Sequence, residues 1–209
     1  MNYYIAVILA GFLLGSMPWG LWMGHLFGKG DIRKSGSGNL GATNVFRTIG
    51  PVAGLLVFVL DAGKGYLATA VLPALLPGSE AYPYLKLVAG LSAFVGHIFT
   101  PFASFRGGKG VATTLGVFLG VAPVPTAISF GVWIVFVALS GIVSLASLVA
   151  SLVLPFSVYL TRGTVPTNWP AVLLLAGLIT LGIWIRHRTN FRRLLTGTEK
   201  SLWRRGPKS

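Results

Sequence analysis

Residues 111–139 read VATTLGVFLGVAPVPTAISFGVWIVFVAL, an uncharged apolar run with Pro123 and Pro125 near its middle. The run exceeds the roughly 20 apolar residues that a helix needs to cross a bilayer. Because proline removes a helical hydrogen bond, this pair predicts either one kinked helix or two short helices that return to the starting side. The run therefore indicates an integral membrane protein and leaves the number of crossings open.

The rest of the chain has the same character. Of its 209 residues, 54% are hydrophobic and 10% are charged, a composition typical of a membrane protein rather than of a water-soluble domain. Further crossings are predicted at residues 3–24, 51–77, 84–104, 142–161 and 170–186. These stretches are too long and alternate too little for a transmembrane barrel, so we predict an all-α bundle in one membrane domain, residues 1–209. The first span has its charges after its apolar run, which favours an uncleaved helix with its N-terminus outside.

The distribution of basic residues decides between one and two crossings at 111–139. Three connections hold most of them: Lys29, Arg33, Lys34 and Arg47; Arg106 and Lys109; and Arg186, Arg188, Arg192, Arg193, Lys200, Arg204, Arg205 and Lys208. Lys86 and Arg162 fall in the opposite connections. The positive-inside rule places all three basic connections in the cytoplasm only if residues 111–139 cross twice.

We therefore predict seven membrane helices, an outside N-terminus and a cytoplasmic C-terminus with a basic tail at 189–209. A helix over residues 111–123 measures roughly 20 Å against a hydrocarbon core of roughly 30 Å, so this pair is expected to be tilted or partly re-entrant.

Charge and cysteine content restrict the chemistry. The chain has 17 Lys and Arg against 4 Asp and Glu, a net charge of +13, which favours anionic partners such as phosphate-bearing substrates and membrane lipid headgroups. It has no cysteine, which excludes disulfides, thiolate nucleophiles and thiolate metal sites. We expect no metal, no cofactor, no nucleic-acid partner and no obligate protein partner.

The first connection, residues 30–44, reads GDIRKSGSGNLGATN. Its glycines allow successive backbone N–H groups to converge on a phosphate, and a helix that begins near Gly41 adds its positive end. Side-chain donors and a neutralising cation are supplied by Ser37, Asn39, Thr43, Asn44 and Arg47. The segment also matches GxGxxG, but it follows a membrane helix and not a strand, which argues against a dinucleotide fold. The alternative is a flexible loop whose glycines only turn the chain.

The second connection, residues 105–114, reads FRGGKGVATT and repeats the combination of glycines and a lysine before a helix. We predict that Lys109 contacts a phosphate; the alternative is a snorkelling lysine that sets topology. The segment is not a Walker motif, because Ala103 stands where the first glycine belongs and Gly110 follows the lysine.

The third connection, residues 186–199, reads RHRTNFRRLLTGTE and predicts an amphipathic continuation of the last span. His187 and Asn190 are three positions apart, hence on one helical face, and we interpret them as functional. For Arg204, Arg205 and Lys208 we prefer a tail held by anionic lipid.

Ionisable and hydroxyl groups also occur inside the spans. Asp61 and Lys64 lie one helical turn apart and are expected to neutralise each other. His97 is either a proton carrier or a buried histidine that bonds a backbone carbonyl. For Ser144 and Ser147 we favour helix packing over ligand binding.

Together the three connections resemble the bacterial PlsY family, glycerol-3-phosphate acyltransferases that use acyl phosphate as donor. The family's signatures appear as DIRKSGSGNLGATNVFRTIG, FRGGKGVATTLG and HRTNFRRLLTGTE, in its order and over nearly the whole chain. The departures are Phe191, where an aliphatic residue is usual, and the lack of a basic residue before SLAS at 144–147.

The resemblance implies a multi-pass protein of the bacterial inner (plasma) membrane whose active site faces the cytoplasm. It implies transfer of a fatty acyl group from acyl phosphate to the 1-hydroxyl of sn-glycerol 3-phosphate, which yields phosphate and 1-acylglycerol 3-phosphate (lysophosphatidic acid) for phospholipid synthesis. The substrate-binding positions that it implies are Ser37, Gly38, Asn39, Thr43, Asn44, Arg47, Lys109, Thr113, Ser147, His187 and Asn190. Ser37, Lys109 and His187 are implied to be catalytic, and Ser35 is not expected to take part.

The general base stays open. Thioester-dependent acyltransferases use a His and an Asp separated by four residues, and no histidine here has an aspartate at that position. The candidates are His187, His97, Asp61 and a phosphate oxygen of a bound substrate, of which we favour the last. The rival functions are a carrier or channel for phosphate or a phospholipid, against which no inverted repeat is found, and a structural membrane scaffold.

Overall fold

The computed structural model describes residues 3–78, 82, 84–166 and 168–203, and these residues form helices and turns without any strand. The basic residues Arg204, Arg205 and Lys208 of the predicted tail lie outside the described residues. Contacts divide the chain into two compact units, Met1–Val121 and Ala122–Ser209. Each unit is described by itself.

Within the described residues, six helical segments are long and apolar enough to cross a membrane. They are Tyr3–Leu26, Pro51–Leu75, Leu85–Ala103, Pro123–Ser140, Val143–Leu160 and Trp169–Arg186. They confirm the prediction of an all-helical, multi-pass membrane protein.

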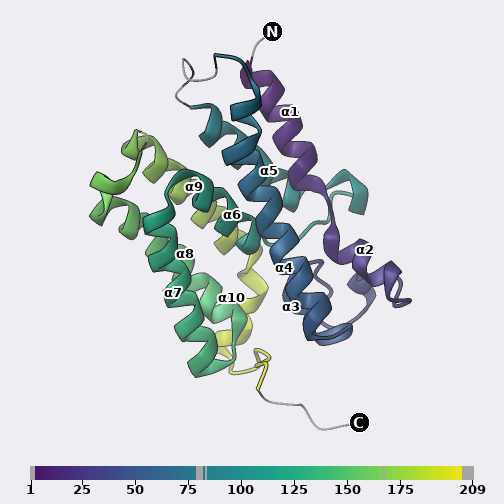
Figure 1. Cartoon of the computed structure of the whole chain (residues 1–209). Helices are drawn as coiled ribbons and strands as arrows, with labels where there is room; N and C mark the ends of the chain where they lie inside the picture. Colours follow the sequence, from purple (N-terminus) through teal and green to yellow (C-terminus); the bar gives the residue numbers. More distant parts are fainter. Residues whose placement is uncertain (1–2, 79–81, 83, 167, 204–209) are drawn as a thin grey trace, which may run out of the picture. The chain divides into compact units, whose positions relative to one another are not determined.

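The first predicted span consists of two helices, α1 (Tyr3–Ser16) and α2 (Trp19–Leu26), with a break before α2. Proline at position 18 explains the break, since it has no N–H to continue the helical ladder. α1 packs along α5 (Leu85–Ile98) (Figure 1). Gly11 and Gly15 of α1 lie against the backbone of Ala89 and Ala93, so this contact uses small residues four positions apart, as membrane helices commonly do.

α4 (Pro51–Tyr66) continues through a π-helical turn at Leu67–Val71 and a 3₁₀ turn at Pro73–Leu75. It packs on α6 (Val111–Val121). A Cβ at Gly116 would overlap the carbonyl oxygen of Ala62, so glycine permits the close approach of these two helices.

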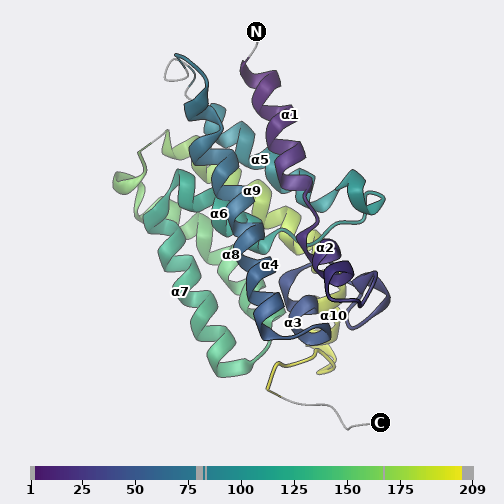
Figure 2. The ribbon, with the colours of Figure 1, turned by 45° about the vertical axis from the view of Figure 1, so that its right-hand side comes forward.

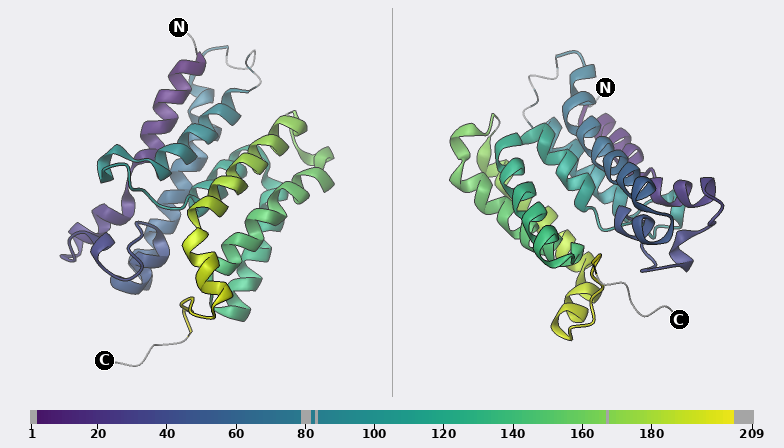
Figure 3. Two further views of the ribbon diagram at one scale, coloured as in Figure 1. Left: turned by 180° about the vertical axis from the view of Figure 1, so that it is seen from behind. Right: turned by 60° about the horizontal axis from the view of Figure 1, so that its bottom comes forward.

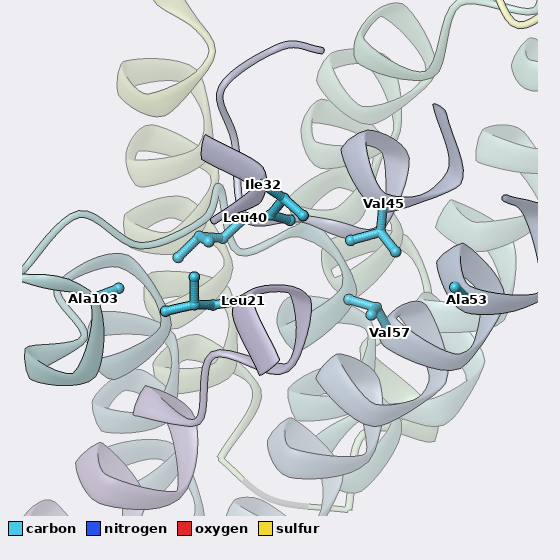
Figure 4. Packing of buried hydrophobic residues seen from close by; sticks show 7 residues of the cluster. All are labelled: Leu21, Ile32, Leu40, Val45, Ala53, Val57 and Ala103. Atoms are coloured by element: carbon cyan, nitrogen blue, oxygen red, sulfur yellow. The ribbon is translucent and has the colours of Figure 1, made fainter. Parts of the chain in front are cut away.

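The first connection folds over an apolar core. It contains a 3₁₀ turn at Ile32–Lys34 and the short helix α3 (Ala42–Thr48), which packs on α4. The core cluster comprises Leu21, Ile32, Leu40, Val45, Ala53, Val57 and Ala103. Figure 4 shows Ile32 and Leu40 of the connection directed toward Leu21 of α2. Burial of these side chains gives the glycine-rich segment a defined conformation rather than that of a flexible loop.

The apolar run at 111–139 divides into two helices. α6 ends at Val121, Ala122 is extended with φ −149° and ψ 75°, and α7 (Pro123–Ser140) begins with Pro123 in its first turn. The prolines therefore end one helix and begin the next. With 11 residues, α6 measures about 16 Å at 1.5 Å per residue, shorter than the hydrocarbon core. A seventh crossing stays a prediction.

The second unit contains α7, α8 (Val143–Leu160), α9 (Trp169–Arg186) and α10 (Arg188–Leu195). α8 packs on both α7 and α9 (Figures 2 and 3). The hydroxyl of Thr180 on α9 donates to the carbonyl of Ser151 on α8 at 2.7 Å, which fixes the register of this helix pair.

Candidate active site

Asn44 holds the first connection in shape. Its side chain is 1% exposed, and Oδ1 accepts the backbone N–H of Ser37 at 2.7 Å. Its Nδ2 donates to the carbonyls of Ile32 at 3.0 Å and Ser35 at 3.2 Å. Sequence reasoning placed Asn44 among the substrate-binding residues; the structure shows its amide engaged with the loop's own backbone.

Two other predicted residues have local roles in this loop. Oδ1 of Asn39 accepts the N–H of Gly41, which begins the turn into α3. Gly38 has φ +72°, a left-handed conformation that glycine adopts without strain. Ser37 is exposed, whereas Thr43 and Arg47 are half-buried. The predicted helix start near Gly41 is confirmed, because Gly41 is the N-cap of α3.

Arg33 ties the first connection to the segment before the second. Its Nε and terminal nitrogen donate to both carboxylate oxygens of Asp31 at 2.6–3.0 Å. Its other terminal nitrogen donates to the carbonyl of Ala103 at 2.7 Å. The hydrogen bonds from Arg33 lower the pKa of Asp31 to about 2, so this carboxylate stays ionised at neutral pH. Sequence reasoning counted Arg33 among the basic residues that set the topology and that favour an anion, and it did not predict these hydrogen bonds.

The second connection lies against the end of α5. The N–H of Gly107 donates to the carbonyl of Ile98 at 3.0 Å, and that of Gly108 donates to the carbonyl of His97 at 3.1 Å. Lys109 is half-buried and is followed by Gly110, which has φ +84° and precedes α6. The predicted position of Lys109 at a helix start is confirmed.

Thr113 lies in the first turn of α6 with 0% of its surface exposed. Among the described residues its hydroxyl has no hydrogen-bond partner. A buried unsatisfied hydroxyl is rare in a folded protein, and Thr113 is one of the residues that the resemblance implies for substrate binding.

Asp61, Lys64 and His97 form a buried polar cluster in the same unit. Nζ of Lys64 lies 2.8 Å from Oδ1 of Asp61, which confirms the predicted pair. Nδ1 of His97 lies 3.6 Å from the same oxygen. The three side chains line a pocket of about 200 Å³, including its open mouth, together with Ser16, Met17, Pro18, Trp19, Gly20, Leu40, Thr100 and Gly108.

In the second unit, Glu199 gathers three donors. Its carboxylate accepts Nδ2 of Asn190 at 2.6 Å, Nε of Arg193 at 2.6 Å and the hydroxyl of Ser144 at 2.8 Å. Sequence reasoning gave Glu199 no role and treated Ser144 as a packing residue. Glu199 is the only acidic residue of the third connection, residues 186–199. Its presence among so many basic residues was the one feature of the sequence that could have indicated an ion pair there.

His187 and Ser147 also lie in the second unit. Nδ1 of His187 is 2.9 Å from the carbonyl oxygen of Ile183, and since a carbonyl only accepts, the proton of the neutral imidazole is on Nδ1 and the lone pair on Nε2. The hydroxyl of Ser147 donates to the carbonyl of Val143 at 2.8 Å and accepts Nε1 of Trp133 at 3.2 Å.

The chain is similar to known proteins over nearly its whole length. A family model described as glycerol-3-phosphate acyltransferase matches residues 5–197. A glycerol-3-phosphate acyltransferase of Desulfotalea psychrophila is 43% identical over 197 residues, covering 94% of this chain and 96% of the relative. One of Sinorhizobium medicae is 42% identical over 202 residues, covering 97% and 94%.

Two solved structures have the same fold. The glycerol 3-phosphate form of PlsY (YgiH), an integral membrane glycerol 3-phosphate acyltransferase, matches with a TM-score of 0.84 and 35% identity over 95% of both chains. Its lysophosphatidic acid form matches with a TM-score of 0.81 and the same identity over 95% of this chain and 94% of that one. The family match over nearly the whole length, together with this likeness to solved structures, shows that the chain belongs to the PlsY family of glycerol-3-phosphate acyltransferases.

Proposed function

We propose that this protein transfers a fatty acyl group from acyl phosphate to the 1-hydroxyl of sn-glycerol 3-phosphate and releases phosphate and lysophosphatidic acid. Family membership supports acyl transfer to glycerol 3-phosphate. The lysophosphatidic acid form of the PlsY structure supports the product. The choice of acyl phosphate as donor rests on the resemblance of the three connections.

The observation that best supports the proposal is the ordered, cationic first unit. Asn44 and Arg33 hold the first connection in a fixed shape, and Arg33 bonds the turn that leads to Lys109. Both substrates are phosphate-bearing anions, so cations and hydroxyl groups carried on an ordered backbone can bind them without a large ordering cost. A half-buried Lys109 beside three glycines fits a phosphate contact better than a snorkelling role.

The reaction requires one substitution at the acyl carbon. The oxygen of the glycerol 1-hydroxyl forms a bond to the carbonyl carbon, and the bond from that carbon to the phosphate oxygen breaks. The hydroxyl proton passes to a phosphate oxygen, and hydrogen phosphate leaves with the bonding electron pair. Acyl phosphate is a mixed anhydride, so its leaving group makes a covalent enzyme intermediate unnecessary.

We infer that catalysis depends mainly on orientation and electrostatic stabilisation. Lys109 and Arg47 offset the charge of the phosphates, and Ser37 orients the acceptor. A substrate phosphate oxygen is the favoured base, with Nε2 of His187 as the side-chain alternative. The further substrate-binding residues are Gly38, Asn39, Thr43, Thr113, Ser147 and Asn190, while Asn44 contributes by shaping the loop that presents Ser37.

We further propose seven crossings, with the N-terminus outside and the active site on the cytoplasmic side of the bacterial inner membrane. The position of the basic residues supports this topology, as does the division of residues 111–139 at Ala122.

The test is turnover by the purified protein in detergent and in liposomes, with acyl phosphate and glycerol 3-phosphate. We expect equimolar release of phosphate and lysophosphatidic acid, and no product when glycerol replaces glycerol 3-phosphate. Acyl coenzyme A serves as the matched alternative donor. Turnover with acyl coenzyme A but not with acyl phosphate would overturn the proposed donor.

A further inference from the structure

The cluster of Asp61, Lys64 and His97 takes no part in the proposed bond-making steps, yet it is buried and charged. The side chains of Lys64, Asp61 and His97 are 2%, 4% and 8% exposed. Ionisable groups inside a membrane helix bundle are costly and are usually functional. A buried ion pair stabilises a fold little compared with apolar residues of the same shape, so stability alone does not account for the cluster.

The cluster has a fixed geometry. Oδ1 of Asp61 faces both Nζ of Lys64 at 2.8 Å and Nδ1 of His97 at 3.6 Å. Nζ of Lys64 also donates to the carbonyl of Met17 at 2.8 Å, at the break before α2. Asp61 of α4 therefore faces the imidazole of His97 on α5. Lys64, also on α4, links Asp61 to the chain at Met17.

The opposite edge of the imidazole lies against the second connection. A Cβ at Gly108 would overlap Nε2 of His97, with Cε1 at 2.9 Å and Cδ2 at 3.2 Å. A Cβ at Gly107 would instead overlap the carbonyl oxygens of His97 and Ile98. The His97 ring thus fills the space beside Gly108, the residue directly before Lys109.

We propose that His97 is a positioning residue for phosphate binding: Asp61 and Lys64 fix its imidazole, and the imidazole fixes the backbone at Gly108 and thereby the ammonium of Lys109. The proposal rests on the proposed function, because it assigns Lys109 to the phosphate of glycerol 3-phosphate. It gives the buried cluster a role in substrate affinity without any contact with the substrate.

A double-mutant cycle between positions 97 and 108 tests the contact. His97→Asn keeps an amide N–H near the place of Nδ1, facing Asp61, but removes Nε2 and Cε1. We expect Gly108→Ala to weaken binding of glycerol 3-phosphate by about 100-fold, because a displaced Lys109 ammonium loses a charged hydrogen bond to the phosphate. Addition of His97→Asn should raise the affinity of this variant for glycerol 3-phosphate about tenfold, because the new Cβ at position 108 then occupies the space that the imidazole has left.

Gly107→Ala is the matched control. Its Cβ overlaps backbone oxygens, which no substitution at position 97 removes. We expect Gly107→Ala to stay equally impaired with and without His97→Asn. Calorimetric titration with glycerol 3-phosphate measures the affinities, and steady-state kinetics should show the change in KM for glycerol 3-phosphate and not for acyl phosphate.

The outcomes separate this inference from the proposed function. Restored affinity in Gly108→Ala/His97→Asn, but not in the Gly107 pair, supports the positioning role. Equal affinity of Gly108→Ala with and without His97→Asn overturns it, as does equal rescue of Gly107→Ala. If the wild-type protein binds glycerol 3-phosphate but does not turn it over, the proposed function is wrong, and the affinities of the double-mutant cycle still test the positioning role. A wild-type protein that does not bind it at all overturns both.

Discussion

The side chain of Asn44 accepts the backbone N–H of Ser37 at 2.7 Å, across seven positions of the chain. The same amide donates to the carbonyls of Ile32 and Ser35, so three of its hydrogen-bonding positions are used on the loop itself. A glycine-rich segment that would otherwise sample many conformations is thereby held in one, and Ser37 is presented on its exposed side.

Replacement of Asn44 by aspartate should therefore impair both stability and activity. The second carboxylate oxygen would face two carbonyl oxygens with no proton to donate, and we expect a loss of about 1–3 kcal/mol of unfolding free energy. We also expect a higher KM for glycerol 3-phosphate. Thr48→Val is the control, because the Thr48 hydroxyl donates to the backbone carbonyl of Asn44 and not to its side-chain amide. Thermal unfolding in detergent and steady-state kinetics measure the two effects; an unchanged unfolding temperature in Asn44→Asp would contradict this role.

Arg33→Lys should loosen the connection between the two glycine-rich segments. Lysine cannot make the paired bonds to Asp31 and at the same time reach the carbonyl of Ala103. We expect faster hydrogen exchange of backbone amides in residues 28–41 and 101–106, with about a tenfold change for each 1.4 kcal/mol lost. The exposed neighbour Lys34, changed to arginine, is the control. Equal exchange in Arg33→Lys and wild type would show that the bond to Ala103 does not order the loop.

The membrane class and the ion pair of Asp61 and Lys64 were predictable from local patterns, namely the length of apolar runs and two charges one turn apart. The helix boundary at Pro123 was predictable only with the distribution of basic residues along the whole chain, because the prolines alone left one kinked helix or two helices open. Local patterns were also enough to place the helix starts after Gly41 and Lys109.

Other features depend on contacts between residues distant in sequence. Nothing near Glu199 indicates that it accepts from Ser144, 55 positions earlier, and nothing near His97 indicates that its ring meets Asp61. Asn44 was assigned to substrate because an amide in a glycine-rich loop can bond either a ligand or the loop, and only the folded backbone shows which carbonyls lie within reach.

As pH is lowered, the free energy of unfolding should decrease more steeply in the wild-type protein than in Glu199→Gln. Burial raises the pKa of Glu199, but hydrogen bonds from Arg193, Asn190 and Ser144 outweigh burial, so the pKa lies below its ordinary value of 4.5. The stabilisation is complete above that ordinary value and is lost as pH falls through the lower pKa of the folded state. Unfolding temperatures from about pH 6 to about pH 3 measure this, and parallel curves for the two proteins would count against it.

Lys109→Ala should lower kcat/KM for glycerol 3-phosphate by about 100-fold, a typical effect of removing one donor that stabilises charge in a reaction. Lys29→Ala is the matched control, because Lys29 is an exposed lysine of the other connection and is expected to retain normal kinetics. Both variants should be inserted in the membrane, and their unfolding temperatures in detergent separate a loss of the site from a loss of the fold. Normal kinetics in Lys109→Ala would remove this lysine from the site.

The proposed seven crossings make a prediction about the turn between α6 and α7. Because the protein has no cysteine, single cysteines can be introduced without background. Val124 is 42% exposed and is the second residue of α7, which begins after the break at Ala122. If α6 and α7 form two crossings, Val124→Cys in intact cells should react with an impermeant maleimide, as Arg162→Cys should, whereas Lys34→Cys should react only after lysis.

The short α6 makes the rate of this reaction informative. A helix of about 16 Å reaches about half of a hydrocarbon core of roughly 30 Å unless the bilayer thins around it. Slow labelling of Val124→Cys relative to Arg162→Cys in intact cells, with no faster labelling after lysis, would indicate a re-entrant pair whose turn lies within the membrane. Labelling of Val124→Cys from the cytoplasmic side alone would overturn the seven-helix topology, because α7 would then begin on the side where the positive-inside rule requires it to end.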